Sequence, residues 1–305
     1  MKLKKIVVIG SLNMDLVVNT PRIPALGETV LGSGFFTAPG GKGANQAVAA
    51  ARLGGSVSIV GCVGDDIFGK ELKQNLLVND VDIINVKVIE NTPTGVAMIT
   101  VKDGDNFIIV DPGANFCLTT DIIDELEDLI KDSFLVVIQL EIPFETVERA
   151  VESAHKHGVK VLLNPAPART LPDDLLEKID IITPNEKECE LITGLPVRNI
   201  DDAKAAVSFL MQKGIPQVVI TMGSAGAVYN NGSKIMHKSA VKVKAVDTTA
   251  AGDSFSGAIS VALTEGKSID EAIDFANLVG ALTVTKKGAQ LSLPMRKNVD
   301  EMINK

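Results

Sequence analysis

The sequence lacks a long uncharged hydrophobic run and an excess of basic residues. No apolar stretch approaches the roughly 18 residues that a helix needs to cross a bilayer. Thirty Lys and Arg residues face 38 Asp and Glu residues, which gives a formal net charge of −8 at pH 7. Nucleic acids and anionic membranes are bound through clustered cations, so this balance argues against both partners. A small-molecule partner fits the composition better.

Cysteine and histidine are also scarce. Cys62, Cys117 and Cys189 are far apart, odd in number and not in C-x-x-C spacing. This pattern predicts free thiols in a reducing compartment. His155 and His157 end a helix-like segment without a third ligand nearby, so a zinc site is not expected. We therefore expect a cytoplasmic protein.

The chain is long for one domain, but large α/β proteins often keep a single sheet at 305 residues. Neither a long linker nor an internal repeat interrupts it. Apolar β-branched runs without polar alternation predict strands that are buried on both faces of a parallel sheet. Amphipathic segments of helical length lie between many of them, one of them at residues 120–131. The sequence therefore predicts a three-layer α/β domain with helices on both faces. The predicted strands are 5–10, 57–63, 134–140, 159–164, 179–183 and 217–223.

Two regions break this alternation. Residues 16–38 follow the first strand, and residues 94–115 contain two strand-like runs separated by DGDN, a typical hairpin turn. Together they predict a small β layer outside the main sheet. We place its strands at about 14–38 and 94–112 within one domain of residues 1–305.

Two familiar phosphate-binding patterns fail. GDDIFGKE at 64–71 nearly matches a P-loop, but Glu71 stands where Ser or Thr must meet magnesium. GGKGANQA at 40–47 gives only part of a dinucleotide fingerprint. Any phosphate binding must use another device.

DTTAAGD at 247–253 offers one. We predict a strand at 241–246 and a helix at 255–266, so that Ala250, Ala251 and Gly252 fall at a strand-to-helix junction. Free backbone N–H groups converge there, and small side chains leave them open to a phosphate. Asp253 stands beside them as a candidate base. The simpler alternative is that Asp253 only caps the helix.

Several motifs occur in one order along the chain: GSLNMD, GGKGANQA, NPAPAR, TPNEKE, TMGSAG, DTTAAGDSFSGA and KKGAQLS. In this order they resemble the signatures of the ribokinase (PfkB-type) family of carbohydrate kinases, over nearly the whole chain. The resemblance implies a mostly parallel sheet flanked by helices, with a small β lid over the sugar. It also implies transfer of the ATP γ-phosphoryl group to the 5-hydroxyl of D-ribose. Asp253 matches the family's catalytic base, and the backbone of 250–253 its anion hole.

The same resemblance assigns the substrate contacts. A pentose presents several hydroxyls, which charged and amide side chains can meet. Each of these residues alone could instead be a turn former, a helix residue or a solvated charge. The implied sugar contacts are Asn13, Asp15, Gly41, Lys42, Gly43, Asn45, Glu141 and Asp253.

For the nucleotide, the resemblance implies contacts from Asn185, Thr221, Gly223, Ser224, Gly226, Gly252 and Asn277. TMGSAG could alternatively be only a hairpin turn. Asn185 and Glu188 match a pair that holds Mg²⁺ near the triphosphate through water, although they could simply start a helix.

A potassium site is implied next to the anion hole, with oxygens from Asp247, Thr249, Thr283, Lys286, Gly288 and Ser292. The alternative is that Asp247 caps a turn and Lys286 or Lys287 supplies an internal cation. Lid strands need their outer faces covered, so we also expect a homodimer through the lid.

Two rival functions stay open. The chain could phosphorylate another sugar or a nucleoside, since Phe35, Phe36 and Phe107 could offer stacking surface to a base. It could also be a non-catalytic sugar sensor, against which the Gly252–Asp253 pair speaks.

Overall fold

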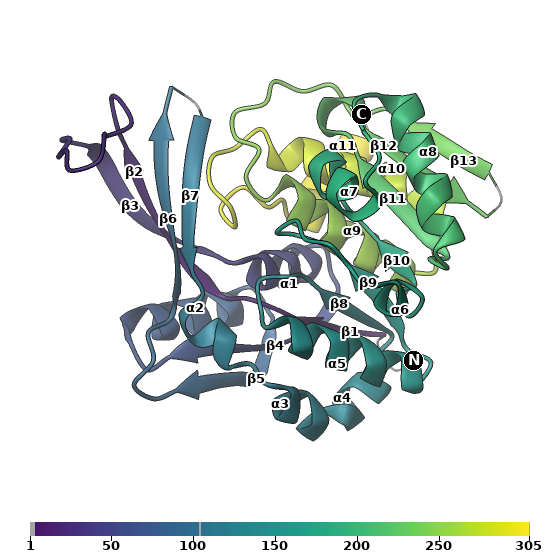
Figure 1. Cartoon of the computed structure of the whole chain (residues 1–305), viewed down its shortest axis with the longest axis horizontal. Helices are drawn as coiled ribbons and strands as arrows, with labels where there is room; N and C mark the ends of the chain where they lie inside the picture. The colour runs from purple at the N-terminus through teal and green to yellow at the C-terminus, as the bar shows by residue number, and fades with distance from the viewer. Residues whose placement is uncertain (1–3, 104, 233, 305) are drawn as a thin grey trace.

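The computed structural model describes residues 4–103, 105–232 and 234–304. In these residues a large sheet lies between two layers of helices, and a second small sheet stands beside it (Figure 1). None of the helices in this part of the chain combines the length and apolarity needed to span a membrane. The predicted three-layer domain with a separate β layer is confirmed.

The large sheet has nine strands within the described residues, in the order β13-β12-β11-β10-β9-β8-β1-β4-β5. All pairs from β11 to β5 are parallel, whereas β12 and β13 add an antiparallel edge. Each predicted buried run forms a strand. The strands are β1 (Lys5–Ile9), β4 (Ser56–Gly64), β5 (Asp82–Ile89), β8 (Leu135–Ile138), β9 (Lys160–Leu163), β10 (Ile181–Ile182), β11 (Gln217–Thr221), β12 (Ala227–Asn231) and β13 (Lys234–Lys238).

Two apolar layers hold the helices on this sheet. Successive side chains of β1 point alternately into the two layers: Ile6 and Val8 belong to one apolar cluster, and Val7 and Ile9 belong to the other. On the first side lie α1 (Lys42–Arg52), α2 (Ile67–Val78), α9 (Ala251–Thr264), α10 (Ile269–Thr283) and α11 (Arg296–Ile303). On the second lie α3 (Thr120–Glu125), α4 (Glu127–Lys131), α5 (Phe144–Lys156), α6 (Asp173–Leu176), α7 (Glu186–Thr193) and α8 (Ile200–Gln212). Short 3₁₀ turns occur at η1 (Gly113–Cys117) and η2 (Gly223–Ala225).

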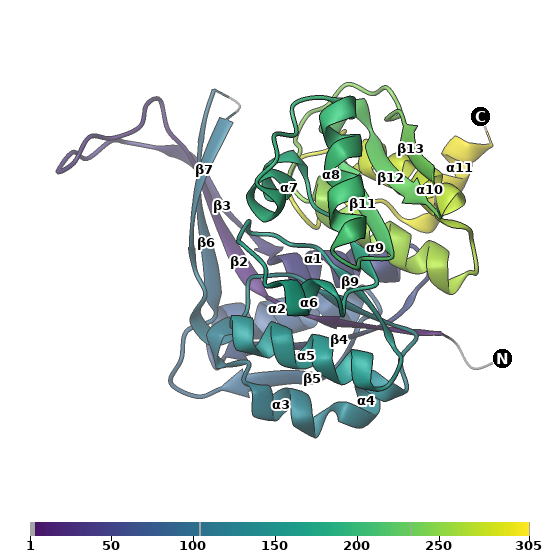
Figure 2. The same ribbon diagram turned by 45° about the vertical axis from the view of Figure 1, so that its right-hand side comes forward.

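The small sheet forms the predicted lid. It runs β3 (Ser33–Gly40), β2 (Asn13–Asn19), β6 (Gly95–Lys102) and β7 (Asp105–Asp111). β6 and β7 pair antiparallel as the expected hairpin, whose Gly104 lies outside the described residues. The lid stands away from the helices, and the connection between β2 and β3 projects farthest (Figure 2).

Two local predictions are wrong. Residues 241–246 form no strand; they are largely exposed, and the N–H of Val246 bonds to the carbonyl of Val284 at 2.7 Å instead of to a sheet neighbour. β13 already occupies that edge of the sheet. The helix expected over 120–131 is divided at Leu126, whose ψ of 15° lies outside the helical range. The three cysteines are free, as expected.

Candidate active site

The carboxylate of Asp253 is held by two neighbouring amides. Asp253 lies in the first turn of α9 and is only 6 % exposed. Asn45 Nδ2 donates to one carboxylate oxygen at 2.9 Å, and Gln46 Nε2 donates to the other at 3.0 Å. Both amides come from α1, which packs against α9. Charge-assisted hydrogen bonds of this kind fix the direction in which the carboxylate points.

The N-terminus of α9 is uncapped by any side chain. Ala250 occupies the N-cap position with a φ of 59°, a left-handed conformation that is uncommon for a residue with a Cβ. Such strain is often stored at functional sites. The first N–H groups of a helix lack intrahelical partners, so this end can receive an anion. The geometry agrees with the predicted anion hole beside Asp253.

A cavity of about 180 Å³ opens directly onto this helix end. It brings together the predicted base, the predicted anion hole, the Asn185 and Glu188 pair and Thr221. The residues around it are Lys42, Asn164, Ala166, Thr183, Asn185, Glu188, Thr221, Thr248, Ala250, Ala251, Gly252 and Asp253.

Four predicted nucleotide contacts do not line this cavity: Gly223, Ser224, Gly226 and Asn277. The first three occupy the tight connection between β11 and β12, which is an antiparallel hairpin. A Cβ on Gly226 would lie 2.0 Å from the Lys238 carbonyl oxygen, so packing alone explains that glycine. Asn277 is nearly buried in α10. Their contact with a nucleotide stays a prediction.

Polar side chains from three segments meet around Glu141. One of its carboxylate oxygens accepts from Ser11 Oγ at 2.5 Å, the Lys42 N–H at 3.1 Å and Asn13 Nδ2 at 3.5 Å. Asn115 Nδ2 donates to Asn13 Oδ1 at 2.7 Å and so orients that amide. The predicted sugar contacts Asn13, Lys42 and Glu141 are therefore brought together at the base of the lid.

The glycines of GGKG allow this close approach. Gly41 has a φ of 85°, and a Cβ on it would lie 2.6 Å from the Asn13 nitrogen. A Cβ on Gly43 would lie 2.6 Å from the Ser11 nitrogen. No side chain fits at either position. The start of α1 can thus contact the residues between β1 and β2.

Several acidic groups share this site, and their charges raise the pKa values of Asp15, Glu188 and Lys42. Burial, followed by the charges of Glu141 and Asp253, raises the pKa of Asp15 to about 7. Burial also raises the pKa of Glu188. Burial is the largest single influence on the pKa of Lys42, and it acts to lower that pKa. The charges of Asp253, Glu141 and Glu188 together outweigh burial, so the pKa of Lys42 is raised. Lys42 is therefore a cation surrounded by carboxylates.

Asn185 and Glu188 form a reciprocal capping box at the start of α7. Asn185 Oδ1 accepts from the Glu188 N–H at 2.9 Å, and the Glu188 carboxylate accepts from Asn185 N and Nδ2 at 2.9 and 2.8 Å. Asn185 and Glu188 therefore do start a helix, as the alternative interpretation expected, but both residues also line the cavity. Carboxylate and amide oxygens retain free lone pairs in this arrangement, so the pair fits an outer-sphere contact with hydrated Mg²⁺.

The segments of the predicted potassium site lie together. Asp247 accepts from the Thr249 N–H at 2.9 Å and from the Gly288 N–H at 2.8 Å. Burial tends to raise the pKa of Asp247, but these hydrogen bonds outweigh it and lower the pKa. Thr283 and Ser292 donate their hydroxyls to the carbonyls of their own turns, which leaves oxygen lone pairs free.

Asp247 also caps a turn, as the alternative interpretation of this region expected. Lys287 helps to lower its pKa. The all-oxygen donor set fits a large monovalent cation. Among the described residues, no cluster of three His, Cys, Asp or Glu side chains offers a site of another type.

Five polar residues of the site escaped sequence reasoning: Ser11, Gln46, Asn115, Gln139 and Asn164. Three of them stood inside motifs already singled out, GSLNMD, GGKGANQA and NPAPAR. Gln139 is a fully buried amide in an otherwise apolar run, and such a residue is itself a signal. Asn115 had no local signal, because its partners are about a hundred residues away.

Comparison with known proteins agrees with this geometry. The model of the pfkB family carbohydrate kinases matches residues 3–296. The chain belongs to this family. It is 44 % identical over 301 residues to a ribokinase of Haemophilus influenzae, with 98 % of each protein covered. It is 40 % identical over 301 residues to a deoxyribokinase of Salmonella typhi, again with 98 % of each covered.

A solved structure extends the comparison to three dimensions. The ribokinase of Arabidopsis thaliana, complexed with ribose and ATP, superimposes with a TM-score of 0.92 at 35 % identity and 99 % coverage of both chains. The ribokinase-like fold predicted from the sequence is confirmed. Membership of this family makes the chain a carbohydrate kinase.

The raised pKa of Asp15 predicts a pH-dependent stability. Its pKa is about 7 in the folded chain against 3.8 for an ordinary aspartate, so the native state binds the extra proton and loses stability as pH rises toward 7. Asp15→Asn removes this loss. In denaturant titrations without ligands, the variant should gain roughly 2 kcal/mol over the unmodified chain between pH 5 and pH 8.

Asp105→Asn, which changes an exposed carboxyl on β7, serves as the control and should show no such gain. An equal difference between Asp15→Asn and the unmodified chain at both pH values would contradict the buried, proton-binding state of Asp15.

Proposed function

We propose that the chain transfers the γ-phosphoryl group of ATP to the 5-hydroxyl of D-ribose, giving D-ribose 5-phosphate and ADP. One observation carries this proposal: the oriented carboxylate of Asp253 lies beside an open helix N-terminus, between the cavity and the polar cluster around Glu141. The similarity to ribokinases over the full chain supports ribose as the sugar.

Phosphoryl transfer needs mainly alignment and charge stabilisation. Asp253 accepts the proton of the 5-hydroxyl while the oxygen of that hydroxyl forms a bond to the γ-phosphorus of ATP. The bond between the γ-phosphorus and the bridging oxygen breaks, and the bridging oxygen leaves with ADP. The N–H groups of Gly252 and Asp253 stabilise the charge that develops on the transferred group. The Lys42 ammonium, on the wall of the same cavity, adds positive charge there.

The sugar occupies the polar cluster at the base of the lid. Buried acceptors and donors of Asn13, Asp15 and Glu141 match several hydroxyls, and the Gly41 to Gly43 backbone approaches closely. Asn45 Oδ1 is buried without a hydrogen-bond partner, so it offers an acceptor to one hydroxyl. A sugar that lacks a matched hydroxyl leaves such groups unpaired.

Mg²⁺ accompanies ATP, and Asn185 and Glu188 hold it through water. Bound there, it neutralises phosphate charge. The nucleotide extends from the cavity past Thr221 toward Gly223, Ser224, Gly226 and Asn277. We place the reaction in the cytoplasm, where ATP is available and thiols stay reduced.

K⁺ activates the enzyme from the site of Asp247, Thr249, Thr283, Lys286, Gly288 and Ser292. Thr248, inside this loop, lines the cavity, and its carbonyl accepts from the Ala251 N–H at 3.2 Å. A cation held by the loop therefore fixes the start of the anion hole without touching the substrates.

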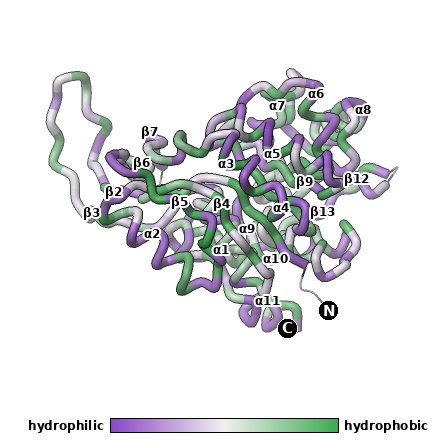
Figure 3. Tube along the Cα trace, turned by 90° about the horizontal axis from the view of Figure 1, so that it is seen from below, coloured by the Kyte–Doolittle hydropathy of each residue, from purple (hydrophilic) through white to green (hydrophobic). Residues whose placement is uncertain are grey.

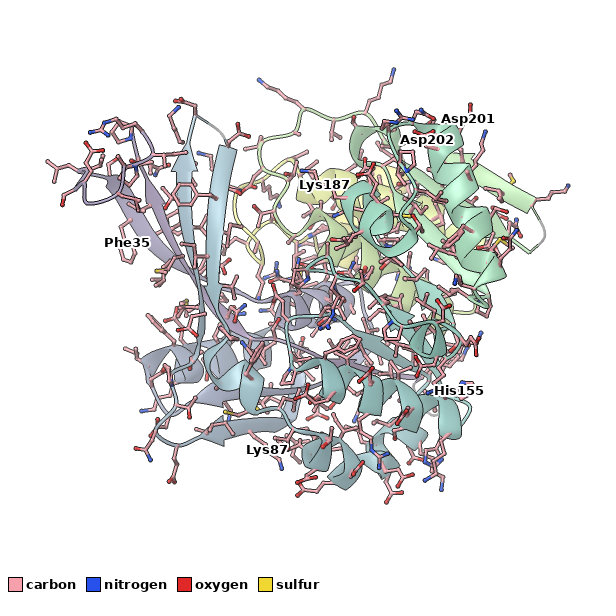
Figure 4. The ribbon with its side chains drawn as sticks, in the orientation of Figure 1. Phe35, Lys87, His155, Lys187, Asp201 and Asp202 are labelled. Carbon is pink, nitrogen blue, oxygen red and sulfur yellow. The ribbon has the colours of Figure 1, made fainter. Side chains whose placement is uncertain are left out.

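The chain forms a homodimer through its lid. Every residue of β7 is exposed, as are most of β3, and the tube is strongly apolar along β6 (Figure 3). Phe35 is 66 % exposed on the outer side of the lid (Figure 4), and Ile109 is 57 % exposed. The lid sheet is apolar on both faces, and one face lies over the sugar. The other face needs a cover, which the lid of a second copy of the chain supplies.

A coupled assay of ADP release tests the sugar. Mg·ATP is supplied with ribose, deoxyribose, fructose, ribulose, tagatose or adenosine, and omission of Mg²⁺ is the blank. We expect ribose to give the highest kcat/KM, because the buried acceptors then all find donors. A tenfold higher kcat/KM for another acceptor would refute the ribose assignment, and release with none of them would favour a sensor.

Potassium activation is tested with initial rates at saturating Mg·ATP and ribose, in KCl and in tetramethylammonium chloride at equal ionic strength. We expect a severalfold higher kcat in K⁺. Asp247→Asn should remove that difference, because it replaces the carboxylate of the site with a neutral amide. Equal rates of the unmodified chain in the two salts would eliminate the cation site.

The dimer is tested by light scattering. The unmodified chain should give twice the mass of one chain, whereas Phe35→Asp with Ile109→Asp should give a monomer because two charges would be buried in the contact. A monomer at all concentrations of the unmodified chain would rule out the dimer.

A further inference from the structure

Gln46 is the residue through which the base is tied to the main sheet. It lies on α1 and is 1 % exposed. Its Nε2 donates to Asp253 Oδ1 at 3.0 Å and to Asn164 Oδ1 at 2.9 Å, and its Oε1 accepts from Gln139 Nε2 at 2.7 Å. Gln139 follows β8, and Asn164 follows β9. The ends of two central strands thus contact the base through one side chain.

The orientation of this amide follows from the carboxylate. An ionised carboxylate can only accept hydrogen bonds, so the atom of Gln46 that faces Asp253 must be the nitrogen. The oxygen of Gln46 must then meet a donor, which fixes the nitrogen of Gln139 toward it. Asn164 is fixed independently, because its Nδ2 donates to the Thr183 carbonyl at 2.9 Å.

This order leaves one atom without a partner. Gln139 Oε1 is buried and makes no hydrogen bond. It lies against Gly10, where a Cβ would come within 2.1 Å of it. Buried acceptors without partners are costly and uncommon in native proteins. The chain keeps this unpartnered oxygen beside Gly10, and the nitrogen of the same amide is the donor to Gln46 Oε1.

Gln46 differs in this respect from its neighbour Asn45. Asn45 has an unpartnered oxygen for a substrate hydroxyl, whereas both polar atoms of Gln46 are used by the protein itself. A residue of this kind acts on the reaction through another group.

We propose that Gln46 is a positioning residue that aims the Asp253 carboxylate at the acceptor hydroxyl, with Gln139 and Asn164 as its fixed supports. This inference rests on the proposed kinase reaction with Asp253 as base. The base lies near Asp15 and Glu188, whose charges repel it, and near Lys42, which attracts it. Without Gln46, only Asn45 holds its direction against these charges.

A double-mutant cycle tests the proposal with purified full-length chain. The four proteins are unmodified, Gln46→Met, Asp253→Asn and the double variant, each assayed with the sugar that the unmodified chain phosphorylates fastest. Gln46→Met should lower kcat by about 10- to 100-fold, the value of a hydrogen bond to a charged group, while calorimetry shows sugar binding within threefold. Asp253→Asn should lower kcat by about a thousandfold or more.

The double variant should match Asp253→Asn within threefold, because Gln46 acts only through that carboxylate. A further tenfold loss in the double variant, or a weakened sugar affinity with unchanged kcat, would overturn the proposal. Because any accepted sugar can be used, a wrong ribose assignment does not affect the cycle. An unmodified chain that releases no ADP with any sugar would refute the kinase reaction instead.

Asn230→Leu is the matched control. Asn230 is also a buried amide, but it bonds Pro216, Gln217 and Val218 at the opposite end of β11 from the cavity. This variant should melt at a lower temperature with an unchanged kcat. If Gln46→Met does not fold, Gln139→Leu replaces it in the cycle. This substitution removes the donor to Gln46 Oε1 and leaves Asp253 untouched, so kcat should fall, but by a smaller factor than in Gln46→Met. An unchanged kcat in that variant would equally refute the role of Gln46.

Discussion

The site depends on the close contact between α1 and α9. A Cβ on Gly257 of α9 would lie 2.8 Å from the Cβ of Ala49 on α1, so only small residues allow the two helices to meet. At that separation, the amides of Asn45 and Gln46 reach Asp253 directly. A larger residue in this seam would separate the base from the residues that orient it. Packing of apolar atoms therefore sets the geometry of a charged group.

The same contact places acidic groups where water is scarce. Glu141, Glu188 and Asp253 lie around Lys42, and burial together with the charges of Glu141 and Asp253 raises the pKa of Asp15. A cluster of this kind is unfavourable in the free protein. Substrate hydroxyls and cations relieve it by supplying donors and positive charge. The residues that destabilise this site are thus those that we propose bind the substrates.

Local sequence signals predicted the core and the chemistry of the site. The two-sided apolar runs predicted β1, β4, β8, β9, β10 and β11, since burial on both faces leaves a clear pattern. The edge strand β5 was not predicted, because most of its side chains are not buried and it lacks such a run. AAGD predicted an open helix end because its small residues have a purely local effect. Residues 241–246, by contrast, alternate between apolar and charged side chains over most of their length, yet they form no strand. Alternation describes which side chains are exposed, and only the rest of the sheet decides whether a strand can pair.

The supporting residues could not be predicted in the same way. Asn115 and Gln139 act over sequence separations of 102 and 93 residues, and nothing next to them in the chain marks their partners. Their roles arise from the register of β1, β8 and β9, which brings the strand ends together. A buried amide in an apolar run indicates that a partner exists. It does not say which residue the partner is.

Strand β2 joins this fixed centre to the lid, and its two halves differ. Asn13, Met14 and Asp15 are buried, whereas the strand is increasingly exposed from Leu16 to Asn19. Asn115 clamps Asn13 to the main domain, and the pairing of β2 with β3 becomes irregular between Val17 and Asn19. Motion of the lid must then bend the strand beyond Asp15, because bending before it would break the buried contacts. The proposed sugar contacts Asn13 and Asp15 consequently belong to the buried part of the strand, and any motion of the exposed half of the lid leaves their geometry unchanged.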